Sequence, residues 1–378
     1  MNVLSLVPYT VFPSRTGGQK GIALFNRYFA RHCRLVCATV PGNEPAFAEG
    51  YTIYNVLPAG SFRYIDLRLF FTLRKLIRRE GITHLVLEHP YFGWLGVWLK
   101  KTTRVRLVVH SHNIEAARWK SLGKWWWKAL HYYEGWTHRR ADYNFFISEE
   151  DHRYALNAYG LLPQRCIVVP YGIEWDRAPG NAHRQTCRQQ LLARHGIDPS
   201  AAILLFNGAF NYKPNSDALL QLLRVVNPLL QQTGLKYTIL ICGKDIPDDI
   251  IRQQWPQVVF AGFVDDVASY FTGADVFLNP ITEGGGIKTK LVEALGYDLA
   301  AVSTRSGAFG IPPALCEGKL LVCEDTEWTT FASLIPQAVN VRASVPAAYF
   351  EHFYWDNVAL KAARFIQEAP LGPQGRTL

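Results

Sequence analysis

The sequence has few of the features that mark secreted, zinc-binding or membrane-spanning proteins. Its seven cysteines are an odd number and none forms a C-x-x-C pair, so neither a disulfide framework nor a structural zinc site is expected. No stretch reaches 18 apolar residues, which predicts that no helix spans a membrane. The first positive side chain, Arg15, follows the apolar start of the chain instead of preceding it, the wrong order for a secretory signal. We therefore expect a protein of a reducing, cytoplasmic compartment.

Several short catalytic motifs are also missing. The sequence contains no D-x-D, no G-x-G-x-x-G, no G-x-S-x-G and no G-x-x-x-x-G-K-[ST]. These absences argue against an aspartate-bound divalent metal, a dinucleotide fingerprint, a serine hydrolase and a P-loop enzyme. No His, Cys and Asp residues are spaced like metal ligands, so we expect no bound metal.

Positive charge, in contrast, is abundant and unevenly spread. The 378 residues carry a net charge of +9, but residues 1–140 hold 21 Lys/Arg and 7 Asp/Glu, or +14, and the remainder is −5. An excess confined to the first part predicts an anionic partner there, such as a membrane surface, a phosphorylated ligand or a nucleic acid.

Tryptophan is concentrated in the same basic part of the chain. Seven of the eleven tryptophans fall between Trp94 and Trp136, a region that also contains several lysines. Such a mixture suits a bilayer interface, and burial in a domain core is an equally good interpretation. We expect peripheral contact with an anionic membrane over the region from Phe62 to Arg140. Since no nucleic-acid motif accompanies the aromatics, no nucleic-acid partner is expected.

Short apolar runs alternate with segments of helical periodicity along the chain. Strands are expected at residues 3–7, 35–40, 85–88, 107–110, 141–148 and 166–170, then at 203–206, 237–242, 258–260, 276–279 and 300–303. Helices are expected over residues 21–31, 65–79, 216–230 and 288–295. This alternation predicts an α/β protein with two Rossmann-like doubly wound domains facing a cleft, divided near residue 172.

Glycines mark two strand-to-helix junctions. Gly17 and Gly18 follow the first strand and precede a helix, an arrangement typical of either a ligand-binding loop or a plain turn. The second junction has three glycines at 284–286, followed by Lys288 and Lys290 in the first helical turn. Lysines at a helix N-terminus are unfavourable unless an anion lies there, so this junction predicts a diphosphate site. A flexible turn followed by a solvated helix is the alternative.

Two histidines lie in the sequence His110-Ser-His-Asn-Ile-Glu115, directly after a predicted strand. This is where the ligand crevice of an α/β sheet is found. His112 can orient a substrate hydroxyl or a phosphate there, whereas His110 is expected to face the sheet. A satisfied structural histidine is the competing interpretation of His112.

Ten segments, in order, resemble the GT-B glycosyltransferases of family 4, which are retaining nucleotide-sugar enzymes. Each segment is short, but together they cover nearly the whole chain. They are Gly17-Gly18, 109–115 (VHSHNIE), 146–151 (FISEED), 168–173 (VVPYGI), 205–219, 241–243 (ICG), 262–267 (GFVDDV), 274–280 (ADVFLNP), 284–295 and 353–357 (FYWDN).

The resemblance implies a division of labour between the domains. Residues 1–172 would form the acceptor-side domain, residues 173–345 the nucleotide-sugar-binding domain, and residues 346–378 a helix that packs back on the first domain. Gly17 and Gly18 would lie beside the donor phosphates and the acceptor, and His112 would contact the transferred sugar. Asn113 and Glu115 are expected on the acceptor side.

In the second domain, the resemblance implies the rest of the donor site. The nucleobase would lie along the segment from Gly262 to Val264, and Glu293 would bind the ribose hydroxyls. The backbone amides for the sugar and the diphosphate would come from Gly285, Gly286 and Ile287.

The sequence departs from the family pattern at two charged positions. The family's acidic pair has seven residues between its members, which places the first member at Gly285. Glu283 is two residues too early. Either Glu283 replaces the missing acid, or the site lacks that acid. The family's Arg near Phe210 is also missing, so Lys213 is the nearest cation, and Lys288 or Lys290 is expected to supply the charge.

These residues predict a retaining, hexosyltransferase-type glycosyltransferase that moves a sugar from a nucleotide-sugar to a glycan or lipid-linked acceptor in cell-surface polysaccharide synthesis. It would use His112, Lys288 and Glu283 in catalysis, need no cofactor or metal, and lie at the inner face of the membrane. One alternative is another GT-B enzyme such as a nucleotide-sugar epimerase, with Glu115 and Glu283 as its carboxylates. The other alternative is a non-catalytic nucleotide-sugar-binding protein.

Overall fold

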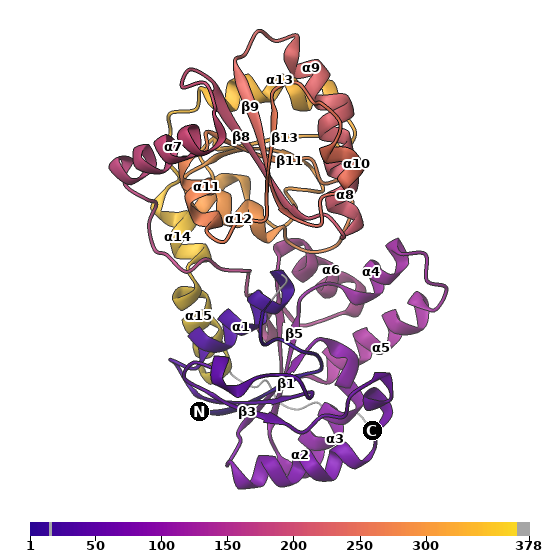
Figure 1. The fold of residues 1–378 in the computed structure, drawn as a ribbon. Coiled ribbons are helices and arrows are strands. Elements are labelled where there is room, and N and C mark those ends of the chain that lie inside the picture. Colours follow the sequence, from indigo (N-terminus) through magenta and orange to yellow (C-terminus); the bar gives the residue numbers. More distant parts are fainter. Residues whose placement is uncertain (15–16, 369–378) are drawn as a thin grey trace. The chain divides into compact units, whose positions relative to one another are not determined.

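The computed structural model describes residues 1–14 and 17–368, and the chain divides into two compact units (Figure 1). The first unit is Met1–Gly172 together with the chain from Phe353 onward, and the second is Ile173–His352. The return to the first unit comes later than residue 346, because α14 (Ala347–Phe353) packs in the second unit, where the Tyr349 hydroxyl donates to the carbonyl of Val292 at 2.7 Å. Residues 369–378 of the expected C-terminal segment lie outside the described residues.

Within its described residues, the first unit is built on seven parallel strands in the order β3-β2-β1-β4-β5-β6-β7. Their bounds are β1 Asn2–Val7, β2 Arg34–Thr39, β3 Thr52–Asn55, β4 His84–Glu88, β5 Arg106–Ser111, β6 Tyr143–Phe146 and β7 Cys166–Val168. Side chains alternate across each strand: Leu4 and Leu6 of β1 join the core under α2 (Arg68–Arg79) and α3 (Gly93–Thr103), so Ser5 points to the opposite face. On that opposite face, α1 (Gly17–Phe29) packs against α15 (Trp355–Glu368). The remaining helices of this unit are α4 Glu115–Ser121, α5 Trp127–Arg140 and α6 Glu149–Tyr159.

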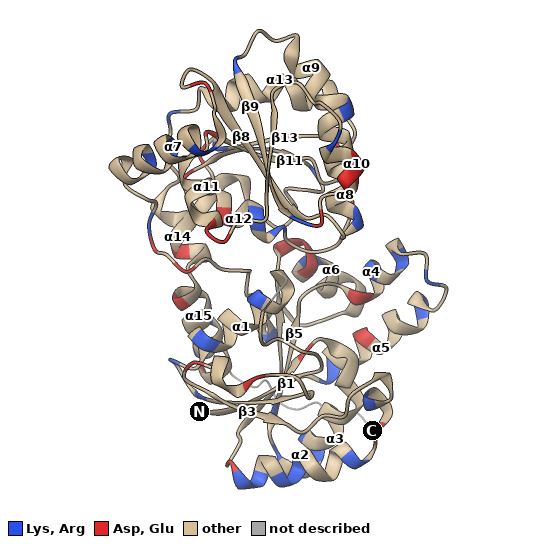
Figure 2. Cartoon of the chain, in the orientation of Figure 1, with Lys and Arg blue, Asp and Glu red and all other residues tan. Residues whose placement is uncertain are grey.

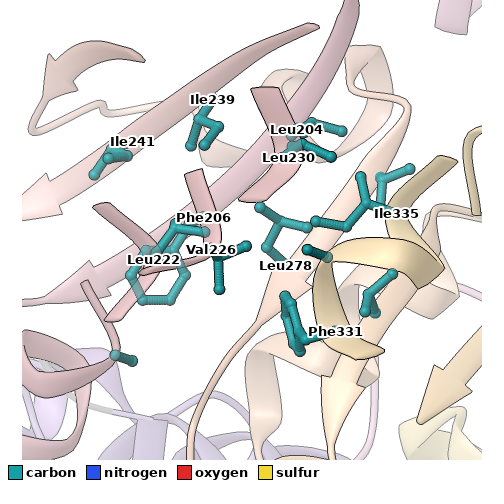
Figure 3. Close-up of a cluster of buried hydrophobic side chains, with 14 of the residues drawn as sticks. Leu204, Phe206, Leu222, Val226, Leu230, Ile239, Ile241, Leu278, Phe331 and Ile335 are labelled. Atoms are coloured by element: carbon teal, nitrogen blue, oxygen red, sulfur yellow. The ribbon is translucent and has the colours of Figure 1, made fainter. Parts of the chain in front are cut away.

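The second unit has six parallel strands in the order β10-β9-β8-β11-β12-β13. Their bounds are β8 Ala202–Ala209, β9 Tyr237–Lys244, β10 Val258–Gly262, β11 Val276–Asn279, β12 Ala300–Thr304 and β13 Leu320–Cys323. Figure 3 shows one side of this sheet, where Phe206, Ile241 and Leu278 meet side chains from the covering helices. The helices are α7 Asn181–His195, α8 Lys213–Gln221, α9 Asn227–Gln231, α10 Asp248–Ile251, α11 Val267–Gly273, α12 Thr289–Gly296 and α13 Trp328–Val339.

The predicted fold class is confirmed, and each predicted strand is present. Two strands escaped prediction, β3 and β13, and both lie at a sheet edge, where a short strand with one unpaired side needs no long apolar run. The helix expected over 216–230 is interrupted by a π-helical turn at Leu222–Val226 between α8 and α9.

In both sheets the strand order reverses beside the first strand, at β1/β4 and at β8/β11. The connections leave in opposite directions at such a point, so a crevice opens at the carboxyl ends of the two strands. The loops after β1, β4, β8 and β11 are therefore the places where each unit can hold a ligand.

Candidate active site

The three-glycine loop of the second unit joins β11 to α12. Gly284 and Gly286 have φ of +96° and +73°, which glycine adopts without strain. Lys288 is the N-cap of α12, so the helix begins one residue later than the predicted start at residue 288. Its Nζ donates to the carbonyls of Gly284 and Gly286 at 2.8 and 2.9 Å, so the lysine holds the loop folded over the helix N-terminus.

Lys290, in the first turn of α12, reaches the end of β8. Its Nζ donates to the carbonyl of Asn207 at 2.8 Å. Burial lowers the pKa of Lys288 and the pKa of Lys290 to about 8, because the charged ammonium loses hydration. An ammonium has three N–H donors, so both lysines keep capacity for a further acceptor. An anion bound at this helix N-terminus would stabilise both charges.

The other charged residues expected at the donor site lie closer to solvent. Glu283 is exposed, and its carboxylate is 3.6 Å from Nζ of Lys213, which also pairs with Asp217. That pairing raises the pKa of Lys213. Glu293 is half-buried within α12. Gly285 is exposed at the loop, whereas Ile287 is buried beneath it, so only its backbone can serve a ligand.

A cavity of about 390 Å³ opens where β9 and β10 end, within the size range of ligand pockets. It is lined by Gly243, Lys244, Asp245, Ile246, Ile251, Gly262 and Phe263. Nζ of Lys244 lies 4.3 Å from the centroid of the exposed Phe263 ring, and Val264 follows half-buried. An aromatic face beside a cation suits a flat, electron-rich base. The resemblance pointed to the segment from Gly262 to Val264, which includes Phe263, but not to Lys244.

In the first unit, Gly17 and Gly18 form the first residues of α1 and are exposed. A Cβ added at Gly18 would meet no atom within 4 Å, so this helix N-terminus is open to an incoming group. The sequence predicted that Gly17 and Gly18 lie in a loop before the helix, whereas in the structure they belong to the helix itself.

A histidine cluster lies at the carboxyl ends of β4 and β5. Glu88 and His110 are register partners on these neighbouring strands, and both are buried. One carboxylate oxygen, Oε2 of Glu88, is 3.0 Å from Nδ1 of His110 and 2.7 Å from Nε2 of His112. The other oxygen accepts a hydrogen bond from Ser5 Oγ at 3.2 Å. His110 is buried as expected, whereas the His112 side chain keeps 14% of its surface exposed.

His89 joins a second carboxylate to this cluster. Its φ of 73° and ψ of 156° are a conformation almost restricted to glycine, the kind of backbone strain that concentrates at functional sites. Nε2 of His89 is 2.8 Å from the Tyr9 hydroxyl, and Nδ1 is 2.9 Å from Oε1 of Glu115. The His89 ring lies 4.7 Å from the ring of His112.

Of the two residues expected on the acceptor side, Glu115 does not face an acceptor. The Glu115 side chain is fully buried, so it supports His89 instead of facing an acceptor. It also accepts from the Tyr91 hydroxyl at 2.6 Å, and its neighbours lower its pKa to about 2 despite burial. Asn113 is half-buried, and its carbonyl accepts from Ser111 Oγ at 2.8 Å.

Sequence reasoning missed Glu88 and His89. The signal was present, because Glu88 ends an apolar strand, His89 follows it, and the neighbouring strand carries His110 near its own end; adjacent parallel strands end at the same sheet edge. The sequence also showed no metal-ligand spacing, yet ligand atoms of Glu88, His110 and His112 lie within 4.8 Å of one another. Two imidazoles and a carboxylate are a donor set that can hold a transition metal.

Exposed apolar side chains form a basic apolar surface on the first unit. We use this name for Phe62, Ile65, Leu67 and Phe71 together with the exposed Arg68, Lys75, Arg78 and Arg79 of α2. Figure 2 shows the positive charge along α2. Among the seven clustered tryptophans, Trp98 and Trp125 are exposed and the others are half-buried. No helix of the described residues is long and apolar enough to cross a bilayer.

Comparison with known families gives two matches that follow one another along the chain. Residues 16–177 match the model described as Glycosyltransferase Family 4, and residues 201–340 match the model described as Glycosyl transferases group 1. No curated protein matches this sequence.

Solved structures resemble this chain over nearly its full length. A glycosyltransferase from Rickettsia africae has 12% identity and a TM-score of 0.71, with 98% of this chain and 99% of that chain covered. Anabaena HepE in complex with UDP has 14% identity and a TM-score of 0.72, with 97% and 100% covered. WaaG, a glycosyltransferase involved in lipopolysaccharide biosynthesis, has 16% identity and a TM-score of 0.64, with 97% and 100% covered. At such low identity the likeness is one of fold.

The family matches cover both units, in the order that the sequence motifs predicted, and the neighbours share the fold of two parallel-stranded units. The chain belongs to the family 4 glycosyltransferases of the GT-B fold, enzymes that transfer sugars from nucleotide-sugar donors.

Proposed function

We propose that this glycosyltransferase is a retaining enzyme that moves a hexose from a nucleoside diphosphate sugar to an acceptor hydroxyl in the synthesis of a cell-surface glycan or glycolipid. The observation that carries the proposal is the donor site of the second unit. There, a cavity with an aromatic face and a glycine loop with two half-buried lysines lie at one edge of one sheet, at the ends of β9, β10 and β11.

The groups around the glycine loop would stabilise the nucleoside diphosphate as it leaves the sugar. The bond between the sugar carbon and the diphosphate oxygen breaks, and the electron pair leaves with the diphosphate. Backbone N–H groups at the start of α12, with Lys288 and Lys290, stabilise the negative charge that develops. Positive charge from lysines serves the purpose that a divalent ion serves elsewhere, so we propose that no metal is needed. The acceptor proton passes to the departing phosphate, and the new bond forms on the same face of the sugar.

The remaining donor contacts are assigned by position. The nucleobase lies in the cavity beside Gly262 and Phe263, and Glu293 accepts hydrogen bonds from the ribose hydroxyls. In the first unit, His112 contacts the transferred sugar, and Gly17 and Gly18 approach the phosphates through the N-terminus of α1. Glu283 and Lys213 form an exposed ion pair that is available to the sugar or the phosphates.

A membrane-bound acceptor is supported by the basic apolar surface. Four apolar side chains there expose 60% or more of their surface, beside arginines and a lysine of α2. Apolar side chains insert at the headgroup level and each nearby cation attracts anionic lipid, worth about 1 kcal/mol per Lys or Arg. The fold likeness to WaaG, which is involved in lipopolysaccharide biosynthesis, agrees with a glycan or lipid-linked acceptor at the inner face of the membrane.

The donor proposal is tested by thermal stabilisation with UDP, GDP and ADP and with their hexose derivatives, in EDTA and in Mg²⁺. A matching nucleotide raises the midpoint of unfolding because it binds only the folded state. The proposal expects one nucleotide to stabilise equally in EDTA, and expects the product anomer to keep the donor configuration by NMR. Interconversion of nucleotide-sugars would indicate an epimerase, and binding without turnover would indicate a non-catalytic protein.

The membrane proposal is tested by sedimentation with vesicles. The double variant Phe62→Ser/Phe71→Ser is expected to lose binding to anionic vesicles, and high salt is expected to release the wild type. Phe47→Ser is the matched control, since Phe47 is an exposed phenylalanine outside the basic apolar surface. Equal binding to neutral vesicles would contradict the proposal.

A further inference from the structure

Polar side chains gather on one face of the sheet of the first unit, near the carboxyl ends of its central strands. Alternate residues of β1, β4 and β5 are apolar and join the core on the other face; they are Leu4, Leu6, Leu85, Leu87, Leu107 and Val109. Because side chains alternate along a strand, Ser5, Glu88 and His110 point away from that core. His112 follows His110 by two residues and reaches the same carboxylate.

Three atoms of the kind that bind metals converge there: Oε2 of Glu88, Nδ1 of His110 and Nε2 of His112. All three lie within 4.8 Å of one another, and the carboxylate oxygen is 3.0 Å from the first nitrogen and 2.7 Å from the second. Ligand atoms about 2.1 Å from a tetrahedral ion are about 3.4 Å apart, so these atoms need to separate by only about half an ångström. His112 can make that shift, because it lies beyond the end of β5 and is partly exposed.

A buried nitrogen of this cluster also points to a ligand. His110 exposes only 3% of its surface, yet its Nδ1 has no hydrogen-bond partner among the residues that the structure describes. The carboxylate oxygen of Glu88 is close enough, but it lies off the line along which an N–H would point. An unpaired buried nitrogen is unfavourable, and an ion bound by the lone pair of Nδ1 would satisfy it.

The second oxygen of Glu88 is held by the sheet. Oε1 accepts a hydrogen bond from Ser5 Oγ of β1 at 3.2 Å, and Glu88 is in register with His110 of β5. A carboxylate that binds a metal is commonly oriented by such a hydrogen bond. Of the three side chains, only His112 keeps appreciable exposed surface, at 14%, so water or a hydroxyl can approach the ion beside this ring.

We propose that Glu88, His110 and His112 bind a divalent transition-metal ion, Zn²⁺ by preference, with water or a hydroxyl in the fourth position. Two imidazoles and one carboxylate with an open position are a ligand set that zinc takes in proteins. Sequence reasoning missed this set, although two histidines two residues apart at a strand end share one face of a sheet. The ion plays no part in the departure of the diphosphate, which is assigned to groups of the second unit, so the inference goes beyond the proposed function.

Metal binding is measured on the full chain without a histidine tag and without nucleotide, after a chelator has removed any metal. Titration with Zn²⁺ is expected to reach one equivalent per chain, and Co²⁺ is expected to give the visible absorption of a four-coordinate site. If the wild type binds neither ion in a saturable way, the proposal is overturned and the three side chains form a cluster without metal. This measurement needs no variant.

Variants then locate the ion. His112→Ala removes the partly exposed ligand, with the least risk to folding, and is expected to weaken Zn²⁺ binding about a hundredfold or more. Ser5→Ala removes only the hydrogen bond behind Glu88 and is expected to weaken binding about tenfold. His131→Gln changes a half-buried histidine of the same unit outside the cluster, and is the matched control with unchanged affinity. Equal affinity in the wild type and His112→Ala, or an equal loss in His131→Gln, would place the ion elsewhere and overturn the proposal.

The metal site and the proposed function can fail separately. One equivalent of bound zinc in a protein that transfers no sugar from any donor would keep this site and remove the proposed function. Sugar transfer by a wild-type protein that binds neither Zn²⁺ nor Co²⁺ would do the reverse.

Discussion

Binding of a nucleoside diphosphate at the glycine loop should draw protons from solution at alkaline pH. Partial burial lowers the pKa of Lys288 and the pKa of Lys290 from the ordinary value of 10.5 to about 8. At pH 8.5 a group with a pKa of about 8 is protonated about one quarter of the time. A bound diphosphate restores the charge on both, so we expect an uptake of about 1.5 protons for each nucleotide bound.

Calorimetry in two buffers measures this uptake. The observed enthalpy at pH 8.5 is compared in Tris and in Bicine, which differ in ionisation enthalpy, and the difference gives the number of protons taken up. Lys290→Met and Lys288→Met should each remove about half of the uptake. Lys236→Met is the control, an exposed lysine of the same unit. An uptake below about 0.3 proton, or one that is unchanged in both variants, would refute a diphosphate at these lysines.

The same lysines affect the stability of the nucleotide-free protein. Between pH 8 and pH 10.5 the unfolded chain binds protons on these two groups that the folded chain does not bind. The free energy of unfolding therefore rises as the pH increases through this window, by at most about 3 kcal/mol for each lysine. Saturating nucleotide should remove most of this increase, because it raises both pKa values in the folded state.

Three other changes give separate tests. Glu293→Ala should weaken nucleotide binding at least tenfold without lowering the unfolding midpoint of the free protein by more than a few degrees; equal affinity in a titration would contradict the ribose assignment. Gly243→Ala should destabilise the folded protein by about 2 kcal/mol or more, because a Cβ at a φ of +146° would lie 1.7 Å from the Gly208 carbonyl oxygen. Denaturant unfolding that matches the wild type would contradict that close approach. Glu134→Gln should cost about 1–3 kcal/mol in the same assay, since the carboxylate accepts from the amides of Glu115 and Ala116 at 2.9 Å and the new NH₂ group would face one of these donors. A neutral result for Glu134→Gln would show that α4 does not depend on this cap.

Much of the proposed donor site was predictable because its residues are contiguous. Gly284 to Gly286, Lys288, Lys290 and Glu293 lie on one strand–loop–helix connection, so their spacing alone brings them together. The direction in which the lysines point was not predictable. Their ammonium groups bind carbonyls of the loop and of β8, which depends on how the loop folds back on the sheet.

The histidine cluster, in contrast, could not be predicted from spacing along the chain. His112 was recognised from its local sequence, but its partners Glu88 and His89 come from the neighbouring strand, and Tyr9 comes from the loop after β1. Only the register of β4 against β5 determines that Glu88 lies beside His110. The same reason explains why Glu115, expected near the acceptor, is buried under His89.

By itself, the sequence determined the α/β class, the two successive doubly wound sheets, the family, and the strand–loop–helix connection that carries the three glycines and two lysines, because each depends on periodicity or on spacing along one connection. It also determined that positive charge belongs to the first part of the chain. Only the tertiary structure decided which apolar side chains of that part reach solvent beside α2, and which carboxylates meet the histidines. Those outcomes depend on strand order and register, which place residues far apart in the chain on one face of one sheet.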